Sequence, residues 1–118
     1  MFERPIIDPE VQARIYAVGG DALFSEMLHL FLSQIEHYSQ AIESDLARHD
    51  YPSLEAHLHA MKSAASSLGF IALESCLKGF ERATQAHSNW GELCLLAEQW
   101  RKSVSQASDC AEQLLNAN

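Results

Sequence analysis

Apolar residues recur at alternating steps of three and four along most of the chain, which is the spacing of one face of an α-helix. The longest run of this kind lies within about residues 21–48 and contains Phe24, Leu28, Phe31, Ile35, Tyr38, Ile42 and Leu46. A second run follows the break at "HDYPS" and contains Leu54, Leu58, Met61, Ala65 and Leu68. Both runs predict amphipathic helices that bury one face.

Two further helices are predicted in the second half of the chain. The third follows Gly69, a residue typical of the position just after a helix, and its inner face contains Phe70, Leu73, Leu77 and Phe80. Its pattern ends near "AHSNWG", where Ser88 or Asn89 is a candidate N-cap of the last helix. The inner face of that helix contains Leu93, Ala97, Trp100, Val104, Ala107, Ala111 and Leu114. No segment alternates strictly between apolar and polar residues, so we expect no β-strand.

The N-terminal part predicts one shorter helix. Asp8 followed by Pro9 is typical of a helix start. Gly19-Gly20 is predicted to end this helix, of about residues 9–18, and Asp21 to cap the long helix that follows. We therefore predict an all-α fold with one domain, residues 1–118: an up-down antiparallel four-helix bundle over about residues 21–116, covered at one end by the short N-terminal helix.

The composition narrows the classes of partner. The chain has 118 residues, 47% of them hydrophobic, which suits one soluble domain with a single core. Its formal net charge is −8, and its eight Lys and Arg residues are scattered from Arg4 to Lys102. Because nucleic-acid binding requires a concentrated basic surface, we expect no nucleic-acid partner.

Several features favour a cytoplasmic protein. The N-terminal "MFERPIIDPE" lacks the positive region and apolar run of a signal peptide. No uninterrupted apolar run reaches about 18 residues, so we expect no membrane span. Cys76, Cys94 and Cys110 are an odd number without a C-x-x-C pair, which favours buried or half-buried thiols in a reducing compartment. We expect a monomer.

The candidate chemistry lies in "HLHAMKSAASSLG", residues 57–69. With an advance of about 100° per residue, His57 lies about 60° from the mean direction of the apolar run, and His59 lies about 140° from it. His57 is therefore predicted at the boundary of the core, where its ring packs beside Leu54 and Met61. His59 is predicted to face solvent.

The neighbours of His59 on its own face are short. Ala56, Ser63 and Ser66 lie within two turns of it, so a second protein can approach the imidazole without a clash. Lys62 lies one turn away and can place an ammonium group beside an anion on the ring. Because a neutral imidazole is a nucleophile near pH 7, this arrangement favours acceptance of a phosphoryl group.

Other charged residues nearby have simpler explanations. Glu55 lies one turn before the second histidine and could orient its ring, although an ordinary surface carboxylate has the same pattern. Lys78 and Arg82 on the next helix would add to a positive rim. Salt bridges with Glu74 and Glu81 within that helix explain them more simply.

The stretch from His59 to Gly69 resembles the motif of histidine phosphotransfer (HPt) domains. It has a histidine, a hydrophobic residue two positions later, lysine at three, a small residue at four and glycine at ten. The resemblance covers about residues 24–114. It implies a four-helix bundle in which His59 is phosphorylated, Lys62 stabilises the phosphoryl charge and Ser63 is the small residue. Glycine is the commonest residue at that small position, so serine is a mild departure. The spelling "HAMKSAAS", with an early cysteine in the next helix, is similar to LuxU-type phosphotransferases of quorum-sensing relays.

The resemblance also implies partners. Such domains carry phosphate from the receiver aspartate of a hybrid sensor kinase to that of a response regulator, and the receiver binds Mg²⁺. We expect no cofactor or metal in this protein, and no autonomous kinase activity, since the sequence has no G-x-x-x-x-G-K-[ST] motif or glycine-rich nucleotide loop. The residues expected to dock the partner are Glu55, Ala56, Ser63, Ser66 and Gly69.

Two other classes of function remain alternatives. Glu26-x-x-His29 has the spacing found in di-iron four-helix bundles, but those sites require two such pairs, and His29 is predicted to face water. A helical adaptor without chemistry would expose a large apolar patch. Trp90, Leu95 and Leu96 are the candidates for such a patch.

Overall fold

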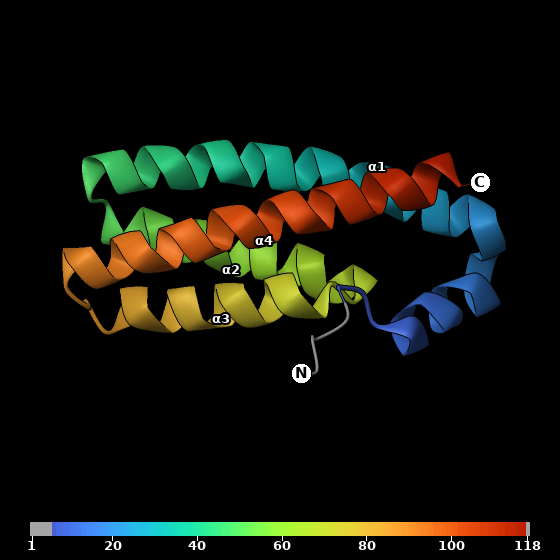
Figure 1. The fold of residues 1–118 in the computed structure, drawn as a ribbon, viewed down its shortest axis with the longest axis horizontal. Helices are drawn as coiled ribbons and strands as arrows, with labels where there is room; N and C mark the ends of the chain where they lie inside the picture. Colours follow the sequence, from blue (N-terminus) through green and yellow to red (C-terminus); the bar gives the residue numbers. More distant parts are fainter. Residues whose placement is uncertain (1–5, 118) are drawn as a thin grey trace.

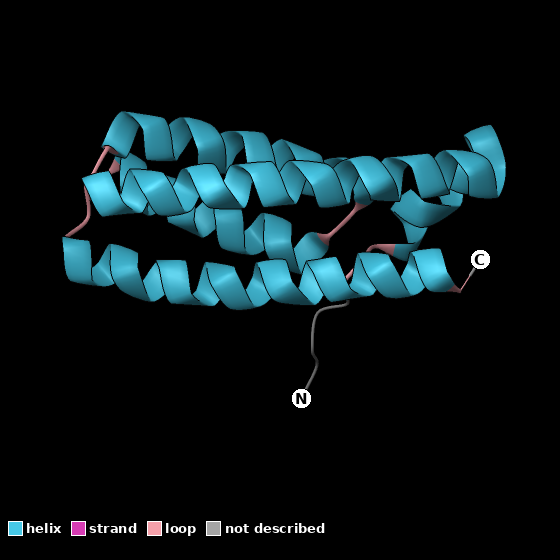
Figure 2. Cartoon of the chain, turned by 90° about the horizontal axis from the view of Figure 1, so that it is seen from above, coloured by secondary structure: helices cyan, strands magenta, loops and turns pink. Residues whose placement is uncertain are grey.

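The computed structural model describes residues 6–117, which form four helices joined by short loops. Helix α1 spans Pro9–Arg48, α2 spans Tyr51–Leu68, α3 spans Ile71–Gln85 and α4 spans Trp90–Asn116. Each helix contacts two others, in the ring α1–α2–α3–α4, and successive helices run in opposite directions (Figure 1). Figure 2 shows only helices and loops in this part of the chain, so the predicted all-α up-down bundle is confirmed. Residues 1–5, with Arg4, and residue 118 of the predicted domain lie outside the described residues.

Helix α1 is broken at Gly20. This residue has φ 64° and ψ −156°, a non-helical conformation that separates residues 9–19, the N-terminal segment, from the part of α1 in the bundle. The break lies within the predicted Gly19-Gly20 pair. At the start of the segment, the N–H of Asp8 donates to the carbonyl of Gly69 at 2.7 Å. The N-terminal segment therefore lies across the end of the bundle that holds the α2–α3 turn (Figure 1).

Helix α1 is also relevant to membrane insertion. The sequence pattern predicted no span, but by length and composition alone α1 is apolar enough to cross a membrane. One such helix is weak evidence, because the core helix of a soluble protein passes the same test. Phe24, Leu28 and Phe31 of α1 are buried against the other helices. The bundle core therefore occupies the apolar face of this helix.

The core is formed by the predicted apolar faces. Their members are buried except for Tyr38, Val104 and Leu114, which are half-buried and pack against the same core. The thiol prediction is partly wrong, because Cys94 is exposed on α4, whereas the other two cysteines are half-buried. Burial raises the pKa of both half-buried thiols, so they are not reactive thiolates at neutral pH.

Three turns share one backbone arrangement. At the ends of α1, α2 and α3 a single residue adopts the left-handed conformation: His49 (φ 52°), Gly69 (φ 76°) and His87 (φ 51°). Its N–H returns to a carbonyl of the last helical turn, as from Gly69 to Ser66 at 3.1 Å. This pattern is the Schellman cap. It confirms the predicted role of Gly69 as the residue that ends α2.

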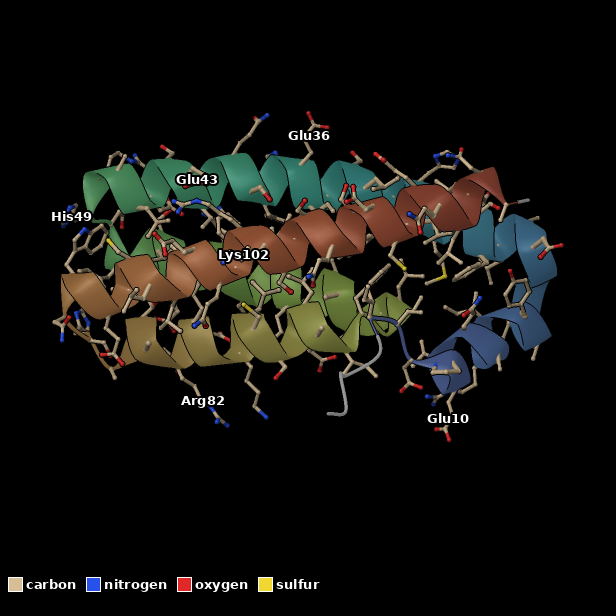
Figure 3. The ribbon with its side chains drawn as sticks, viewed as in Figure 1. Glu10, Glu36, Glu43, His49, Arg82 and Lys102 are labelled. Carbon is tan, nitrogen blue, oxygen red and sulfur yellow. The ribbon has the colours of Figure 1, made fainter. Side chains whose placement is uncertain are left out.

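The two left-handed histidines stack on aromatic rings of the neighbouring turn. The ring of His49 lies 3.6 Å from that of Trp90, centre to centre, and His87 lies 4.9 Å from Tyr51. Tyr51 in turn meets Trp90 edge to face at 6.2 Å. These four rings join the α1–α2 and α3–α4 turns at the end of the bundle marked by His49 in Figure 3, opposite the N-terminal segment.

The left-handed backbone at Gly69 gives a stability prediction. A Cβ added there would lie 2.8 Å from Cβ of Val11, and the backbone itself disfavours any side chain. We expect Gly69→Ala to lower the free energy of unfolding by about 1–3 kcal/mol, measured by urea denaturation. The control is Gly79→Ala in α3, where an added Cβ meets nothing within 4 Å, and it should stabilise by about 0.5–1 kcal/mol. Equal stability of Gly69→Ala and wild type would contradict this account of the turn.

Candidate functional site

The rotation of α2 about its axis decides which of its residues face solvent. Leu58 and Met61 are fully buried. The Sδ atom of Met61 also accepts a hydrogen bond from Nε1 of Trp100, on α4, at 3.4 Å. With these residues in the core, His59 points outward, and its side chain is 64% exposed. The exposure predicted for His59 is confirmed.

A buried carboxylate on α3 binds both functional candidates on α2. Oε2 of Glu81 lies 3.0 Å from Nδ1 of His59, and Oε1 of Glu81 accepts a hydrogen bond from Nζ of Lys62 at 2.6 Å. The Glu81 side chain is only 8% exposed. The sequence interpretation assigned Glu81 to a salt bridge within α3, and this was wrong. The signal was available, because Glu81 lies about 40° from buried Leu77 on a helical wheel.

The charge on Glu81 determines which nitrogen of His59 is free. Burial by itself would raise the pKa of Glu81, but hydrogen bonds from Lys62 and His59, and attraction to both, lower it below its ordinary value. Glu81 is therefore ionised at neutral pH. An ionised carboxylate only accepts hydrogen bonds, so Nδ1 of His59 carries the proton and donates it. In the neutral ring the lone pair then lies on Nε2.

His59 and Glu81 line an open groove between α2 and α3. The groove is lined by Pro52, Glu55, Ala56, His59, Glu81 and Gln85. Oε1 of Glu55 accepts a hydrogen bond from Nε2 of Gln85 at 3.0 Å across this groove. Orientation of the His59 ring, considered for Glu55, is instead provided by Glu81. The groove gives a second molecule room beside the imidazole.

The short residues predicted around His59 lie on the surface. Ala56, Ser63 and Ser66 are all exposed. The hydroxyl of Ser63 donates to the backbone carbonyl of His59 at 3.2 Å, so this side chain lies folded against its own helix. The surface beside the imidazole is therefore low, as the sequence pattern predicted.

A second groove lies on the other side of α2, against α1. It has a volume of about 460 Å³ and a mainly apolar lining of Met27, Leu30, Phe31, Gln34, Tyr38, Ala60, Ser63, Ala64, Ser67 and Leu68. Leu30 is 58% exposed at its edge. Because Ser63 lines this groove and lies one turn from His59, the apolar surface is continuous with the surroundings of the imidazole.

Some predicted residues do not join the site. Gly69 was predicted to dock a partner, but it is buried and covered by Asp8 and Val11 of the N-terminal part, so it has no surface to offer. Lys78 and Arg82 are exposed, and Arg82 points away from the bundle (Figure 3). Their contribution to a positive rim therefore has no support from the geometry.

His57 is held by a second buried carboxylate. Its Nδ1 lies 2.6 Å from Oδ2 of Asp45, near the end of α1, and the Asp45 side chain is 1% exposed. Oδ1 of Asp45 accepts hydrogen bonds from Ser53 at 2.8 Å and from Arg48 at 3.1 Å. The boundary position predicted for His57 is confirmed, but a polar network holds its ring there. This network ties α1 to the first turns of α2.

The alternative functions gain little from the geometry. In the described part of the chain, no three His, Cys, Asp or Glu side chains converge in a way that could hold a metal ion, and His29 is exposed. Of the residues proposed for an adaptor patch, Trp90 is stacked on His49, and Leu96 packs against the core. Only Leu95 of the three is exposed, at 63%.

Comparisons with known proteins agree with this architecture. The crystal structure of histidine-containing phosphotransfer protein B (HptB) from Pseudomonas aeruginosa PAO1 superposes with a TM-score of 0.88 at 20% sequence identity. The alignment covers 98% of this chain and 99% of that one, and at this identity the likeness concerns the fold. A search of curated proteins found no match. The family model of the Hpt domain matches residues 26–116. The chain therefore belongs to the Hpt domain family, whose members are phosphotransfer modules of phosphorelays.

Proposed function

We propose that Nε2 of His59 accepts a phosphoryl group from the aspartate of one receiver domain and passes it to the aspartate of another. The donor would belong to a hybrid sensor kinase and the acceptor to a response regulator. The observation that carries the proposal is the exposed imidazole whose Nδ1 is bound by buried Glu81. That contact leaves Nε2 as the outward nucleophile.

Lys62 is the proposed source of positive charge for the phosphoryl group. Its ammonium has three N–H donors, and the bond to Glu81 uses one of them. The remaining donors are available to phosphoryl oxygens. Charge neutralisation and positioning are the main needs of phosphoryl transfer, so Mg²⁺ and the acceptor carboxylate of the receiver would supply the rest. The domain needs no nucleotide site of its own in this scheme.

The proposed docking surface consists of Ala56, Ser63 and Ser66 with the groove between α1 and α2. The short side chains admit the receiver, and the apolar lining of the groove offers it area to bury. Glu55 contributes at the polar edge through the groove between α2 and α3. We propose that the protein acts as a cytoplasmic monomer. The quorum-sensing resemblance stays a prediction.

We expect His59→Ala to abolish phosphoryl acceptance. Wild type and His57→Ala should gain acid-labile label when mixed with Mg²⁺ and a panel of labelled phospho-receiver domains. His57→Ala is the control, because it removes a neighbouring imidazole that is also bonded to a carboxylate. Label that persists on His59→Ala would contradict the assignment and direct attention to the other histidines.

We expect Ser63→Gln to slow transfer by about tenfold or more, a barrier increase of about 1.4 kcal/mol. The larger side chain would occupy the approach to His59. Ser105→Gln is the matched control, since Ser105 is exposed on α4, a helix that does not contact α2. The measurement is the initial rate of transfer from one active receiver, with circular dichroism to verify folding. A wild-type rate for Ser63→Gln would refute the docking proposal.

A further inference from the structure

The bond between Glu81 and His59 bears on both halves of a transfer reaction. Glu81 divides its two oxygens, with Oε2 at 3.0 Å from Nδ1 of His59 and Oε1 at 2.6 Å from Nζ of Lys62. Because each oxygen has its own partner, the imidazole contact does not require Lys62 to leave. The carboxylate is buried, whereas the imidazole is exposed, so the fixed member of the pair is Glu81.

We propose that Glu81 is a positioning residue that keeps the proton on Nδ1 of His59 while the phosphoryl group arrives and while it leaves. The inference rests on the proposed function of His59 and adds to it the way in which the modified ring is kept reactive. Glu81 touches the imidazole only at Nδ1 and has no contact with the atoms that react.

The arrival of the phosphoryl group needs no proton transfer. The lone pair of Nε2 forms the N–P bond, and the P–O bond to the donor aspartate breaks, with its electron pair staying on the carboxylate oxygen. The ring of His59 then carries a positive charge together with the proton on Nδ1. The negative charge of Glu81 lies against that proton and stabilises the charged ring, as the carboxylate partner of a catalytic histidine does.

The departure is the reverse sequence of bonds. An oxygen of the acceptor aspartate forms a new P–O bond, the N–P bond breaks, and its electron pair returns to Nε2. If Nδ1 is still protonated, the leaving group is a neutral imidazole. If that proton has been lost, the leaving group is an imidazolate anion, which leaves far less readily. Retention of the proton therefore keeps phospho-His59 an active donor.

The charges around His59 come from two helices. On α2 they are Glu55, in the same groove, and Lys62, which is bonded to Glu81. On α3, Glu81 contacts the imidazole, and exposed Lys78 and Arg82 lie farther along the helix surface. No residue of α1 or α4 lines this groove. Lys62 offsets part of the negative charge, so we expect the effect of Glu81 to be at the low end for a paired charge, about one pH unit.

The test measures loss of phosphate from the isolated protein. Full-length wild type and Glu81→Gln are phosphorylated with phosphoramidate, and the rate of hydrolysis is followed from about pH 6 to 9, the range around neutral imidazole titration. The rate falls as the ring proton is lost. We expect the midpoint of that fall to lie about one pH unit higher in wild type than in Glu81→Gln. Glu36→Gln is the matched control, because Glu36 points away from the bundle (Figure 3).

A second comparison protects the test against misfolding of Glu81→Gln. The midpoint for wild type is compared with that of free phosphohistidine carrying phosphate on the same ring nitrogen, and it should again lie about one pH unit higher. Equal midpoints for wild type, Glu81→Gln and the free amino acid would overturn the role of Glu81 and leave the proposed function standing. A wild-type protein that takes no phosphoryl group on His59, from phosphoramidate or from receivers, would overturn both.

Discussion

The burial of Leu58 and Met61 is the constraint on which the rest of the site depends. These two residues of α2 are fully buried, and the bond from Trp100 to Met61 adds a specific contact to the packing. Once they are in the core, the helical advance of about 100° per residue places His59 outside. A phosphoryl-acceptor histidine requires this exposure, and the core supplies it without any contact made by the histidine itself.

Two buried carboxylates then fix α2 against its neighbours. Asp45 of α1 binds His57, and Glu81 of α3 binds His59 and Lys62. Removal of either carboxylate would leave its partners without an acceptor, and a buried charge is tolerated only when it is paired in this way. The two histidines differ in exposure: the side chain of His57 is 32% exposed and that of His59 is 64% exposed. The same pairing therefore serves packing at one position and presentation of a nucleophile at the other.

Much of this structure could be predicted from the sequence. The apolar faces, the break at Gly20, the cap at Gly69 and the outward direction of His59 depend on residues close together in the chain, so local patterns were sufficient. Glu81 was missed because its partners lie on another helix, 22 residues away in the case of His59. Helix periodicity tells which face is buried, but not which polar groups meet across it. The left-handed His49 and His87 were missed for a related reason, since their stacking partners belong to other turns.

The central claim is that Glu81 presents His59 with its proton on Nδ1 and its lone pair on Nε2. The most direct measurement is ¹⁵N NMR of the imidazole nitrogens in unphosphorylated protein at mildly alkaline pH, with the His59 signals identified by their loss in His59→Ala. The account predicts a protonated, pyrrole-type Nδ1 and an unprotonated, pyridine-type Nε2. A His59 ring that carries its proton on Nε2 instead would contradict the account.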